Sequence, residues 1–381
     1  MELAGRNSPR AGSVVAGVTL LFEPYTLRTL TFRNRIWVAP MCQYSAEPDG
    51  PEAGVPNDWH FAHLASRATG GAGLVITEAT AVSPVGRISP QDLGIWNDRQ
   101  VEAFSRITAF IASQGAVPGI QLAHAGRKAS TAPPWNSGGL VTSRDGGWEP
   151  VGPSPIAFSE DLATPHELTA DEIAGIVEEF RAAAERALAA GFKVAEVHGA
   201  HGYLTHQFLS PISNHRIDGY GGSFENRIRF ALEVTDAVRS VWPEELPVLF
   251  RVSATDWLAE AGDERPSWTV DDTVELARRL KEHGVDLIDT STGGNVAGAK
   301  IALGPAYQVP FARRIRDEAG IASGAVGLIT EPVQAEKIVA DGDADVVLLA
   351  RELLRDPYWP LHAARELGVD VTVPEQYARA F

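Results

Sequence analysis

Cysteine is nearly absent from this chain of 381 residues. Its single cysteine, Cys42, excludes an intramolecular disulfide and a cysteine-ligated iron–sulfur cluster. No apolar run is long enough to span a bilayer, and the short run at 14–22 is followed by Glu23 and Pro24 without a small-residue cleavage site. A single cysteine fits a reducing compartment. Together with the lack of a membrane span and of a cleavage site, it predicts a cytoplasmic protein without a membrane partner.

Basic charge is also scarce. The chain has 33 lysines and arginines against 49 aspartates and glutamates, which gives a net charge of −16 at pH 7. A surface this acidic repels phosphate backbones, and no cluster of basic residues offsets it, so we expect no nucleic-acid partner. Apolar residues make up 44% of the chain, which supports a large buried core and excludes wholesale disorder.

Strand and helix signals alternate along the chain. Short runs rich in valine and isoleucine are continuously apolar, which is typical of strands covered on both faces in a parallel sheet. We predict strands at 35–40, 73–80, 117–124, 193–198, 247–253, 286–292, 321–327 and 345–350. Each is followed by a segment of helical period, at 57–69, 98–114, 169–190, 224–241, 270–283, 306–318, 332–341 and 352–366.

Eight strand–helix units in one chain predict an α/β fold of the (β/α)₈ TIM-barrel class. A doubly wound sheet is the structural alternative, but it would more often carry a Gly-x-Gly-x-x-Gly turn after its first strand, and the segment 40–44 has none. We predict a single barrel domain at 21–381 after a flexible extension at 1–20. Residues 21–34 are predicted to form a hairpin that plugs the bottom of the barrel.

Unusual polar residues follow the predicted strands at their carboxyl ends, the face on which barrels carry out chemistry. Two of the loops on this face, 125–165 and 199–223, are long enough to act as lids or binding loops. The residues that stand out on this face or within a strand that leads to it are Cys42, Tyr44, Gln121, His124, His198, His201, Tyr203, Arg251, Ser291, Gly327, Ala350 and Arg351.

Two groups of these residues suggest anion binding. Small residues at Gly327 and Ala350 allow backbone N–H groups to approach a phosphate, and Arg351 is placed to pair with it. The alternative is that these positions only form tight turns. Arg251 lies inside an apolar strand and needs an anionic partner there. That partner is either a barrel carboxylate, such as Glu78 or Asp289, or a cofactor that gains negative charge.

Three interpretations of His198 and His201 remain open from the residues alone. They are metal ligands with His206 or His215 as a third, satisfied core histidines, or hydrogen-bond donors to a substrate oxygen with Tyr203 as proton donor. Cys42 likewise fits a nucleophile, a small buried apolar residue or a cofactor contact.

Seven strings of the sequence together resemble the Old Yellow Enzyme family of flavin-dependent ene-reductases, and most closely its bacterial thermophilic-like subgroup. The resemblance runs from about Leu21 to the C-terminus. The strings are APMCQYS (39–45), EATAV (78–82), QLAHAGR (121–127), HGAHGYL (198–204), NHRIDGYGGS (214–223), FRVS (250–253) and RELLRDP (351–357).

The resemblance implies an FMN-containing (β/α)₈ barrel and assigns roles to matching positions. His198 and His201 bind the substrate oxygen, Tyr203 donates a proton, and Tyr44 also faces the substrate. Arg379 is implied to reach a neighbouring subunit's site, which makes the protein a homodimer or homotetramer. The implied FMN contacts are Ala39, Pro40, Met41, Cys42, Ala79, Gln121, Arg251, Gly327, Ala350 and Arg351.

The implied activity is that of an NADPH dehydrogenase. NADPH reduces FMN, and a hydride then passes from flavin N5 to the β-carbon of an activated alkene, such as an enone, enal, maleimide, nitroalkene or quinone. Two alternatives remain: a metal-dependent barrel hydrolase that uses His198, His201 and His206, and a flavin carrier without catalysis. The resemblance predicts no metal ion.

Overall fold

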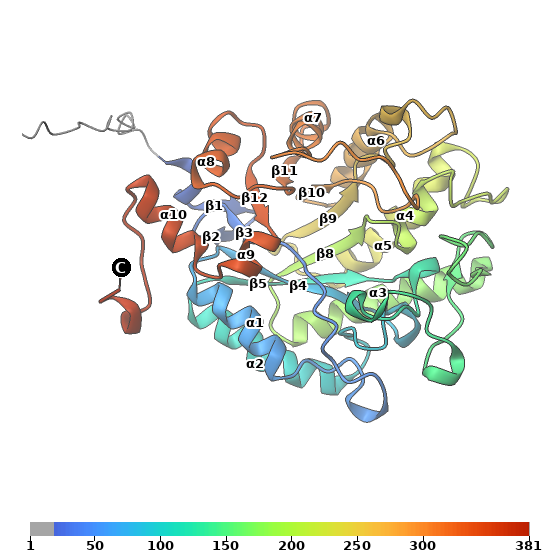
Figure 1. The fold of residues 1–381 in the computed structure, drawn as a ribbon, viewed down its shortest axis with the longest axis horizontal. Helices are drawn as coiled ribbons and strands as arrows, with labels where there is room; N and C mark the ends of the chain where they lie inside the picture. The colour runs from blue at the N-terminus through green and yellow to red at the C-terminus, as the bar shows by residue number, and fades with distance from the viewer. Residues whose placement is uncertain (1–18, 381) are drawn as a thin grey trace, which may run out of the picture.

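The computed structural model describes residues 19–380. Eight parallel strands close into a barrel in the order β10-β11-β12-β3-β4-β5-β8-β9 (Figure 1). This arrangement confirms the predicted (β/α)₈ fold. The barrel strands are β3 (Ile36–Val38), β4 (Leu74–Ala81), β5 (Val117–Ala123), β8 (Val194–Gly199), β9 (Val248–Ser253), β10 (Leu287–Ser291), β11 (Ala322–Ala325) and β12 (Val346–Leu349).

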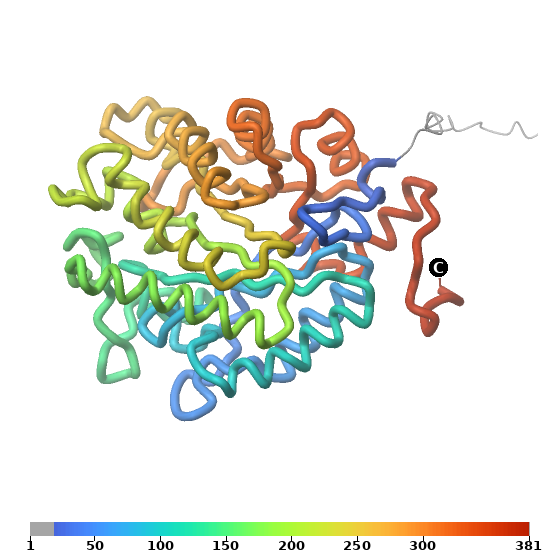
Figure 2. The backbone as a smooth tube through the Cα atoms, turned by 180° about the vertical axis from the view of Figure 1, so that it is seen from behind, coloured from blue at the N-terminus to red at the C-terminus, as the bar shows by residue number. Residues whose placement is uncertain are grey.

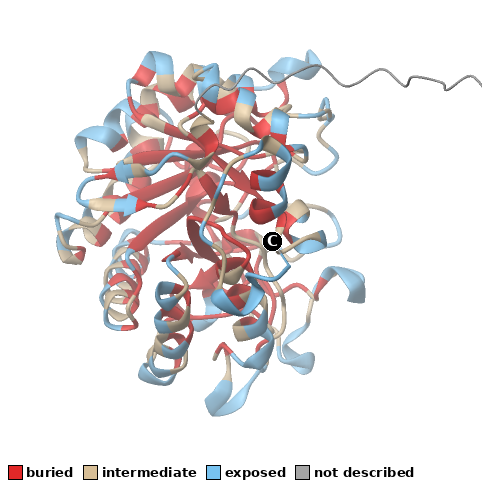
Figure 3. Cartoon of the chain, turned by 90° about the vertical axis from the view of Figure 1, so that its left-hand side faces the viewer, coloured by how far each residue is buried: buried red, intermediate tan, exposed pale blue. Residues whose placement is uncertain are grey.

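The barrel strands are buried on both faces, as their continuous apolar character predicts (Figure 3). Side chains that point inward form one cluster, which includes Trp37, Leu74, Leu249 and Leu287. Side chains that point outward join a larger cluster beneath the helices. The barrel centre is therefore a packed core, and the chemistry must lie at its rim.

Helices surround the barrel, and several begin with the capping chemistry that their sequences carry. Thr169 accepts a hydrogen bond from the backbone N–H of Glu172, whose carboxylate reaches back to the Thr169 N–H, so the predicted capping box is present. The helices are α1 (Asp58–Thr69), α2 (Asp98–Ser113), α3 (Ala170–Ala189), α4 (Leu204–Leu209), α5 (Phe224–Val241), α6 (Val270–Glu282), α7 (Val309–Ala319), α8 (Pro332–Ala340), α9 (Arg351–Arg355) and α10 (Trp359–Leu367).

A hairpin closes the bottom of the barrel, as expected for residues 21–34. Its strands are β1 (Tyr25–Leu27) and β2 (Leu30–Phe32), which pair antiparallel. Leu27 and Phe32 pack into the inward-facing cluster, and the Phe32 ring lies 4.6 Å from that of Trp37. Residues 1–18 of the predicted extension lie outside the described residues.

The segment 352–366 differs from the prediction of one helix. It forms α9 and α10, separated at Asp356 to Tyr358. Pro357 explains the break, because proline disfavours helical geometry at the preceding residue, and Asp356 is indeed extended.

Loop 125–165 contains short elements that the sequence did not reveal. One of them is β6 (Val151–Gly152), which pairs with β7 (His166–Glu167) directly after the loop and contacts α4. Figures 1 and 2 show this green loop at the opposite end of the molecule from the C-terminal tail. None of the described helices is long and apolar enough to cross a membrane.

Candidate active site

A layer of buried polar side chains lies just below the carboxyl rim of the barrel. Gln121 on β5 donates its amide N–H to Glu196 on β8 at 2.8 Å. Arg251 on β9 lies with its Nε 3.0 Å from Oδ2 of Asp289 on β10. Burial raises the pKa of Glu196 to about 8, with Asp289 acting in the same direction. Glu196 and Asp289 therefore do not both ionise readily, and together they balance the positive charge of Arg251 only in part.

Three side chains that the sequence singled out come together above this layer. The ring of His198 lies 5.2 Å from that of His201 and 5.1 Å from that of Tyr203, both edge-on. His198 is the penultimate residue of β8, and the other two lie in the segment that follows this strand. The strand end thus presents two imidazoles and a phenol at one place on the rim.

The backbone of His201 is strained and held from both sides. Its φ is +58°, which is uncommon for a residue other than glycine. Its N–H donates to Ser253 Oγ at 2.9 Å, and its carbonyl accepts from Lys128 Nζ at 2.9 Å. Gly294 packs so closely that a Cβ there would lie 2.6 Å from the His201 Cα. Strain held in this way is typical of functional sites.

Burial is the main cause of the pKa shifts of His198, His201 and Tyr203. It lowers the pKa of His198 and of His201 well below the usual value, with the charge of Arg251 acting in the same direction. It raises the pKa of the Tyr203 phenol well above the usual value. At neutral pH the two imidazoles are therefore uncharged and the phenol keeps its proton.

The predicted alternative of a histidine metal site is wrong in its geometry. His206 Nε2 lies 3.1 Å from Asp256 Oδ1 in the core, where both side chains are fully buried. Its Nδ1 accepts the N–H of Gly202. Within residues 19–380, the only group of three side chains spaced like metal ligands contains no histidine. The rim histidines therefore lack the third ligand that a hydrolytic zinc site needs.

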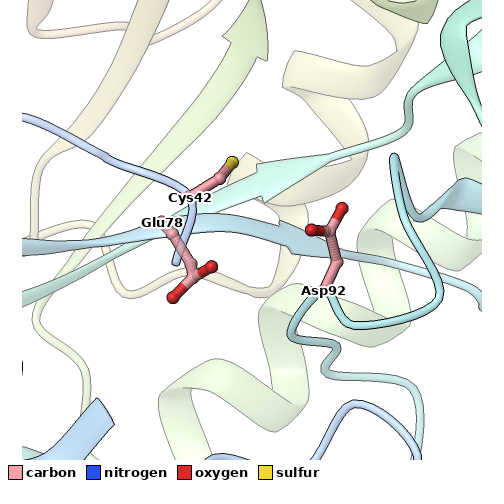
Figure 4. Close-up of side chains that lie close together, drawn as sticks. All are labelled: Cys42, Glu78 and Asp92. Atoms are coloured by element: carbon pink, nitrogen blue, oxygen red, sulfur yellow. The ribbon is translucent and has the colours of Figure 1, made fainter. Parts of the chain in front are cut away.

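That group consists of Cys42, Glu78 and Asp92, whose candidate ligand atoms lie within 4.8 Å of one another. Figure 4 shows that they come from the loop after β3, from β4 and from the segment between β4 and α2. Burial raises the pKa of the Cys42 thiol well above its usual value, and the carboxylates of Asp92 and Glu78 act in the same direction. A protonated thiol is a poor nucleophile, which argues against that interpretation of Cys42.

Tyr44 lies beside this thiol and carries the second strained backbone of the site, with φ at +48°. Cys42, Tyr44, Trp148 and Tyr203 pack against a small apolar cluster that includes Ala79. Trp135 from loop 125–165 meets Tyr44 edge-on at 5.7 Å. The loop therefore forms one wall of the site, as its length predicts.

The predicted phosphate-binding residues also come together. Gly327, Ala350 and Arg351 line one cavity of about 220 Å³, together with Ser291, Gln308 and Arg355. Gly327 has φ at +115°, and a Cβ there would lie 2.6 Å from Gln308 Nε2. Only glycine fits such a position without displacing the amide, so the cradle depends on this residue.

One predicted residue lies apart from the rest. Arg379 is exposed on the C-terminal tail, where it lines a cavity together with Leu361, Ala364 and Arg365 of α10. Neither of the two histidines lines that cavity.

The structure also adds residues that sequence analysis did not single out for the site. Lys128 follows the QLAHAGR string and places its Nζ 5.1 Å from the Tyr203 ring centre. Glu196 interrupts the apolar run of its strand, which is a signal that would have identified it. Trp135 carries no such signal, because only the fold brings it to Tyr44.

Comparison with protein families identifies the chain. Residues 20–369 match the model of the NADH:flavin oxidoreductase / NADH oxidase family. The chain belongs to this family. The family expected from the sequence is thus confirmed, and the protein is an FMN-dependent oxidoreductase rather than a hydrolase.

Curated relatives and solved structures agree with this assignment. An NADPH dehydrogenase of Geobacillus sp. (strain WCH70) is 50% identical over 363 residues, which cover 95% of this chain and 99% of the relative. An NADPH dehydrogenase of Bacillus subtilis (strain 168) is 47% identical over 362 residues, with the same coverage. A morphinone reductase N189A mutant, solved in complex with tetrahydroNAD, is 31% identical with a TM-score of 0.73 and 93% coverage of both chains.

Proposed function

We propose that the protein is an NADPH-dependent ene-reductase that reduces alkenes conjugated to a carbonyl or nitro group. The observation that carries this proposal is that the rings of His201 and Tyr203 each lie edge-on to the ring of His198, at 5.2 and 5.1 Å. Two uncharged donors beside a protonated phenol suit a substrate that develops negative charge on oxygen and then needs a proton on carbon. Enones, enals, maleimides, nitroalkenes and quinones share that chemistry.

The cradle supports FMN as the bound cofactor. Gly327, Ala350 and Arg351 would hold its phosphate, since the small residues expose backbone N–H groups and the arginine supplies charge. The ring system would lie against the loop 39–42 and Ala79, and near Gln121. When bound and reduced by NADPH, FMN supplies the hydride that the β-carbon of the alkene receives.

The positively charged guanidinium of Arg251 would face the bound cofactor. It is buried, and its carboxylate partners Asp289 and Glu196 are themselves reluctant to ionise. Its positive charge is therefore incompletely neutralised by the protein, which favours negative charge on the bound group.

His198 is oriented as a donor. Its Nδ1 accepts the N–H of Ala200 at 3.3 Å, so the proton of the neutral ring belongs on Nε2. In this role, His198 and His201 polarise the alkene by binding its oxygen. The loss of one such donor typically lowers the rate ~10²- to 10³-fold.

Tyr203 would then supply a proton to the α-carbon. Its phenol stays protonated at neutral pH because burial raises its pKa, and the Lys128 ammonium lies over its ring face. Once a proton has left, that cation favours the phenolate until solvent returns the proton.

Two half-reactions, followed separately without oxygen, test this proposal. NADPH should bleach the FMN of the purified holoenzyme, and cyclohex-2-enone should restore its colour. Tyr203→Phe should slow the second step ~10²- to 10⁴-fold and leave the first within about twofold. Equal loss in both steps would contradict the assigned role. FMN that NADPH does not reduce would indicate a flavin carrier instead.

We further propose that Arg379 acts across a subunit interface in a homodimer or homotetramer. Its exposure on the C-terminal tail supports this arrangement. Mixing an Arg379→Ala subunit with a Tyr203→Phe subunit should restore up to a quarter of the activity in a dimer, where one hybrid site has neither change. Mixed subunits that stay inactive would overturn the proposal.

A further inference from the structure

Two acidic side chains, Glu196 and Asp289, point into the barrel just below its carboxyl rim. Each lies two residues past a member of the inward-facing cluster, Val194 on β8 and Leu287 on β10. Because side chains alternate along a strand, both carboxyl groups face inward as well. Both residues are 0% exposed. Two carboxyl groups without access to water are costly unless their charge is paired or removed.

The contacts of these two side chains leave several oxygens without a donor. Gln121 Nε2 donates to Glu196 Oε1 at 2.8 Å, whereas Glu196 Oε2 is buried without a partner among residues 19–380. Asp289 Oδ2 lies 3.0 Å from Arg251 Nε, and neither Asp289 oxygen has an aligned donor there. Burial raises the pKa of both groups. A hydrogen bond between them raises the pKa of Glu196 further and lowers that of Asp289.

A single proton satisfies this arrangement. With the proton on Glu196 Oε2, the unpartnered oxygen becomes a donor to Asp289, and Asp289 keeps its negative charge beside Arg251. Gln121 is unaffected, because it donates to the other oxygen of Glu196. The opposite placement would leave Arg251 beside an uncharged carboxyl group. The pair therefore holds one proton, which belongs on Glu196, and one negative charge, which belongs on Asp289.

We propose that Glu196 and Asp289 share one proton that limits the negative charge near the flavin, so that Arg251 can stabilise the reduced cofactor. This inference rests on the function proposed above in one respect, that Arg251 faces FMN. With the proton in place, the pair carries one negative charge against the positive charge of Arg251. Without it the pair carries two, which oppose the negative charge that the flavin gains on reduction.

The shared proton gives reduction a defined pH dependence. NADPH passes a hydride, which is two electrons and one proton, to FMN and leaves as NADP⁺, so FMN gains one negative charge. Burial raises the pKa of Glu196 to about 8, so below that pH the pair already holds its proton and takes up no other. Above it, reduction draws one proton from solvent onto Glu196, because the new negative charge increases the proton affinity of the carboxylate.

Two other groups near the site titrate in a neighbouring range. Burial lowers the pKa of Lys128 to about 8 and raises that of Asp92 to about 7. The imidazoles of His198 and His201 stay neutral here, because burial and the charge of Arg251 lower their pKa values. The remaining buried carboxyl group beside Cys42 is Glu78, whose pKa burial raises well above its usual value. Lys128 and Asp92 are therefore the alternatives that an experiment must separate from the pair.

Glu196→Gln tests the proposal, because glutamine imitates the protonated form. Its oxygen still accepts from Gln121 and its N–H donates to Asp289, so the variant should fold and bind FMN. The midpoint potential of the FMN-loaded protein is measured with dithionite and redox dyes from pH 6.5 to 9.5. A tenfold change in proton concentration shifts a two-electron couple by about 30 mV for each proton taken up. The original protein should show about 30 mV per pH unit below pH 8 and about twice that above.

Glu196→Gln should keep the shallower slope throughout the range. Its potential should therefore match that of the original protein at pH 7 and lie above it at pH 9.5. Lys128→Gln and Asp92→Asn are the controls, because each removes one of the alternative groups. Both should keep the steeper slope above pH 8.

Infrared difference spectroscopy provides a second readout in the unaltered holoenzyme. Chemical reduction at pH 9.5 should convert one carboxylate into a protonated carboxyl group, and ¹³C-labelled glutamate should shift its band. The band should be absent from Glu196→Gln. This measurement decides the proposal even if that variant does not bind FMN.

Two results would overturn the proposal. One is a steeper slope above pH 8 that persists in Glu196→Gln, and the other is an original protein whose reduction at pH 9.5 protonates no glutamate. If NADPH does not reduce FMN, the proposed function fails, but chemical reduction still decides the protonation of the pair.

Discussion

Arg251 Nε lies 3.0 Å from Asp289 Oδ2 inside the barrel, although neither atom forms an aligned hydrogen bond. The sequence left two interpretations of this arginine open, a structural ion pair and a cation for the cofactor. The ion pair is present, with Asp289 as one of the two predicted partners. Its poor alignment leaves the guanidinium able to act on a second anion as well.

Arg251→Met tests both roles at once. Loss of the cation leaves Asp289 and Glu196 buried without a partner, which should lower the unfolding free energy by about 3–5 kcal/mol. If Arg251 also faces FMN, the reduced and negatively charged form loses stabilisation, and the midpoint potential falls. Arg251→Lys should keep much of the potential, because it keeps the charge. A less stable protein with an unchanged potential would leave only the structural role.

The barrel could be predicted because each of its strands is recognisable from its own short run of residues. Val346 to Leu349 and Leu74 to Ile76 are apolar without alternation, and this pattern requires only that both faces be covered. The break at Pro357 was missed, although the proline itself indicates it.

The residues of the site could be predicted only where they lie within a recognisable sequence motif. The strings around His198 and Cys42 identified their residues, whereas the contacts of Glu196 and Trp135 depend on segments distant in the chain. Glu196 lies 75 residues from Gln121, and Trp135 lies on a loop with no regular period. Their roles follow from the closure of the barrel, which brings strand ends together irrespective of their separation in the chain.

Acid should destabilise the protein in a defined range. Burial lowers the pKa of His60 and of His124 to about 4, and it lowers the pKa of His63 to about 3. The unfolded imidazoles take up protons below about pH 6.5, while the folded ones stay neutral until about pH 4. Their contribution is therefore fully present above pH 6.5 and is lost as the pH falls toward 4.

Urea unfolding at pH 7.5, 6.5 and 5.5 measures this effect. Each such histidine should lower the unfolding free energy by up to about 1.4 kcal/mol per pH unit within the range. His63→Gln removes one of these groups and should make the dependence shallower by about that amount. An unfolding free energy that stays constant from pH 7.5 to 5.5 would contradict the assignment of neutral buried imidazoles.

Gly327→Ala should weaken FMN binding. The added Cβ would lie 2.6 Å from Gln308 Nε2, and the φ of +115° disfavours any side chain. We expect the Kd for FMN, measured by fluorescence quenching, to rise at least about tenfold if more than about 1.4 kcal/mol is lost.

A matched glycine separates crowding from backbone strain. Gly298 also has a positive φ, at +70°, but a Cβ there meets nothing within 4 Å. Gly298→Ala should therefore strain the backbone without altering the Kd for FMN. If both variants bind FMN with the same reduced affinity, the cradle is not at Gly327.

Cys42 should be unreactive until its acidic neighbours are changed. Burial raises the pKa of Asp92 to about 7, so Asp92 is charged at pH 8.5 and opposes ionisation of the thiol. Asp92→Asn keeps an oxygen for the N–H groups of Ile88 and Ser89 but removes this charge. Iodoacetamide should then alkylate the only cysteine roughly tenfold faster, because a charge at this distance contributes about 1–4 kcal/mol.

Two comparisons complete the alkylation experiment, which mass spectrometry follows. Asp58→Asn, at a side chain 95% exposed, should leave the rate unchanged. Bound FMN should protect the thiol in every variant, since the flavin is proposed to lie against Cys42. Equal alkylation with and without FMN would separate Cys42 from the cofactor, and an unchanged rate in Asp92→Asn would show that burial alone keeps the thiol protonated.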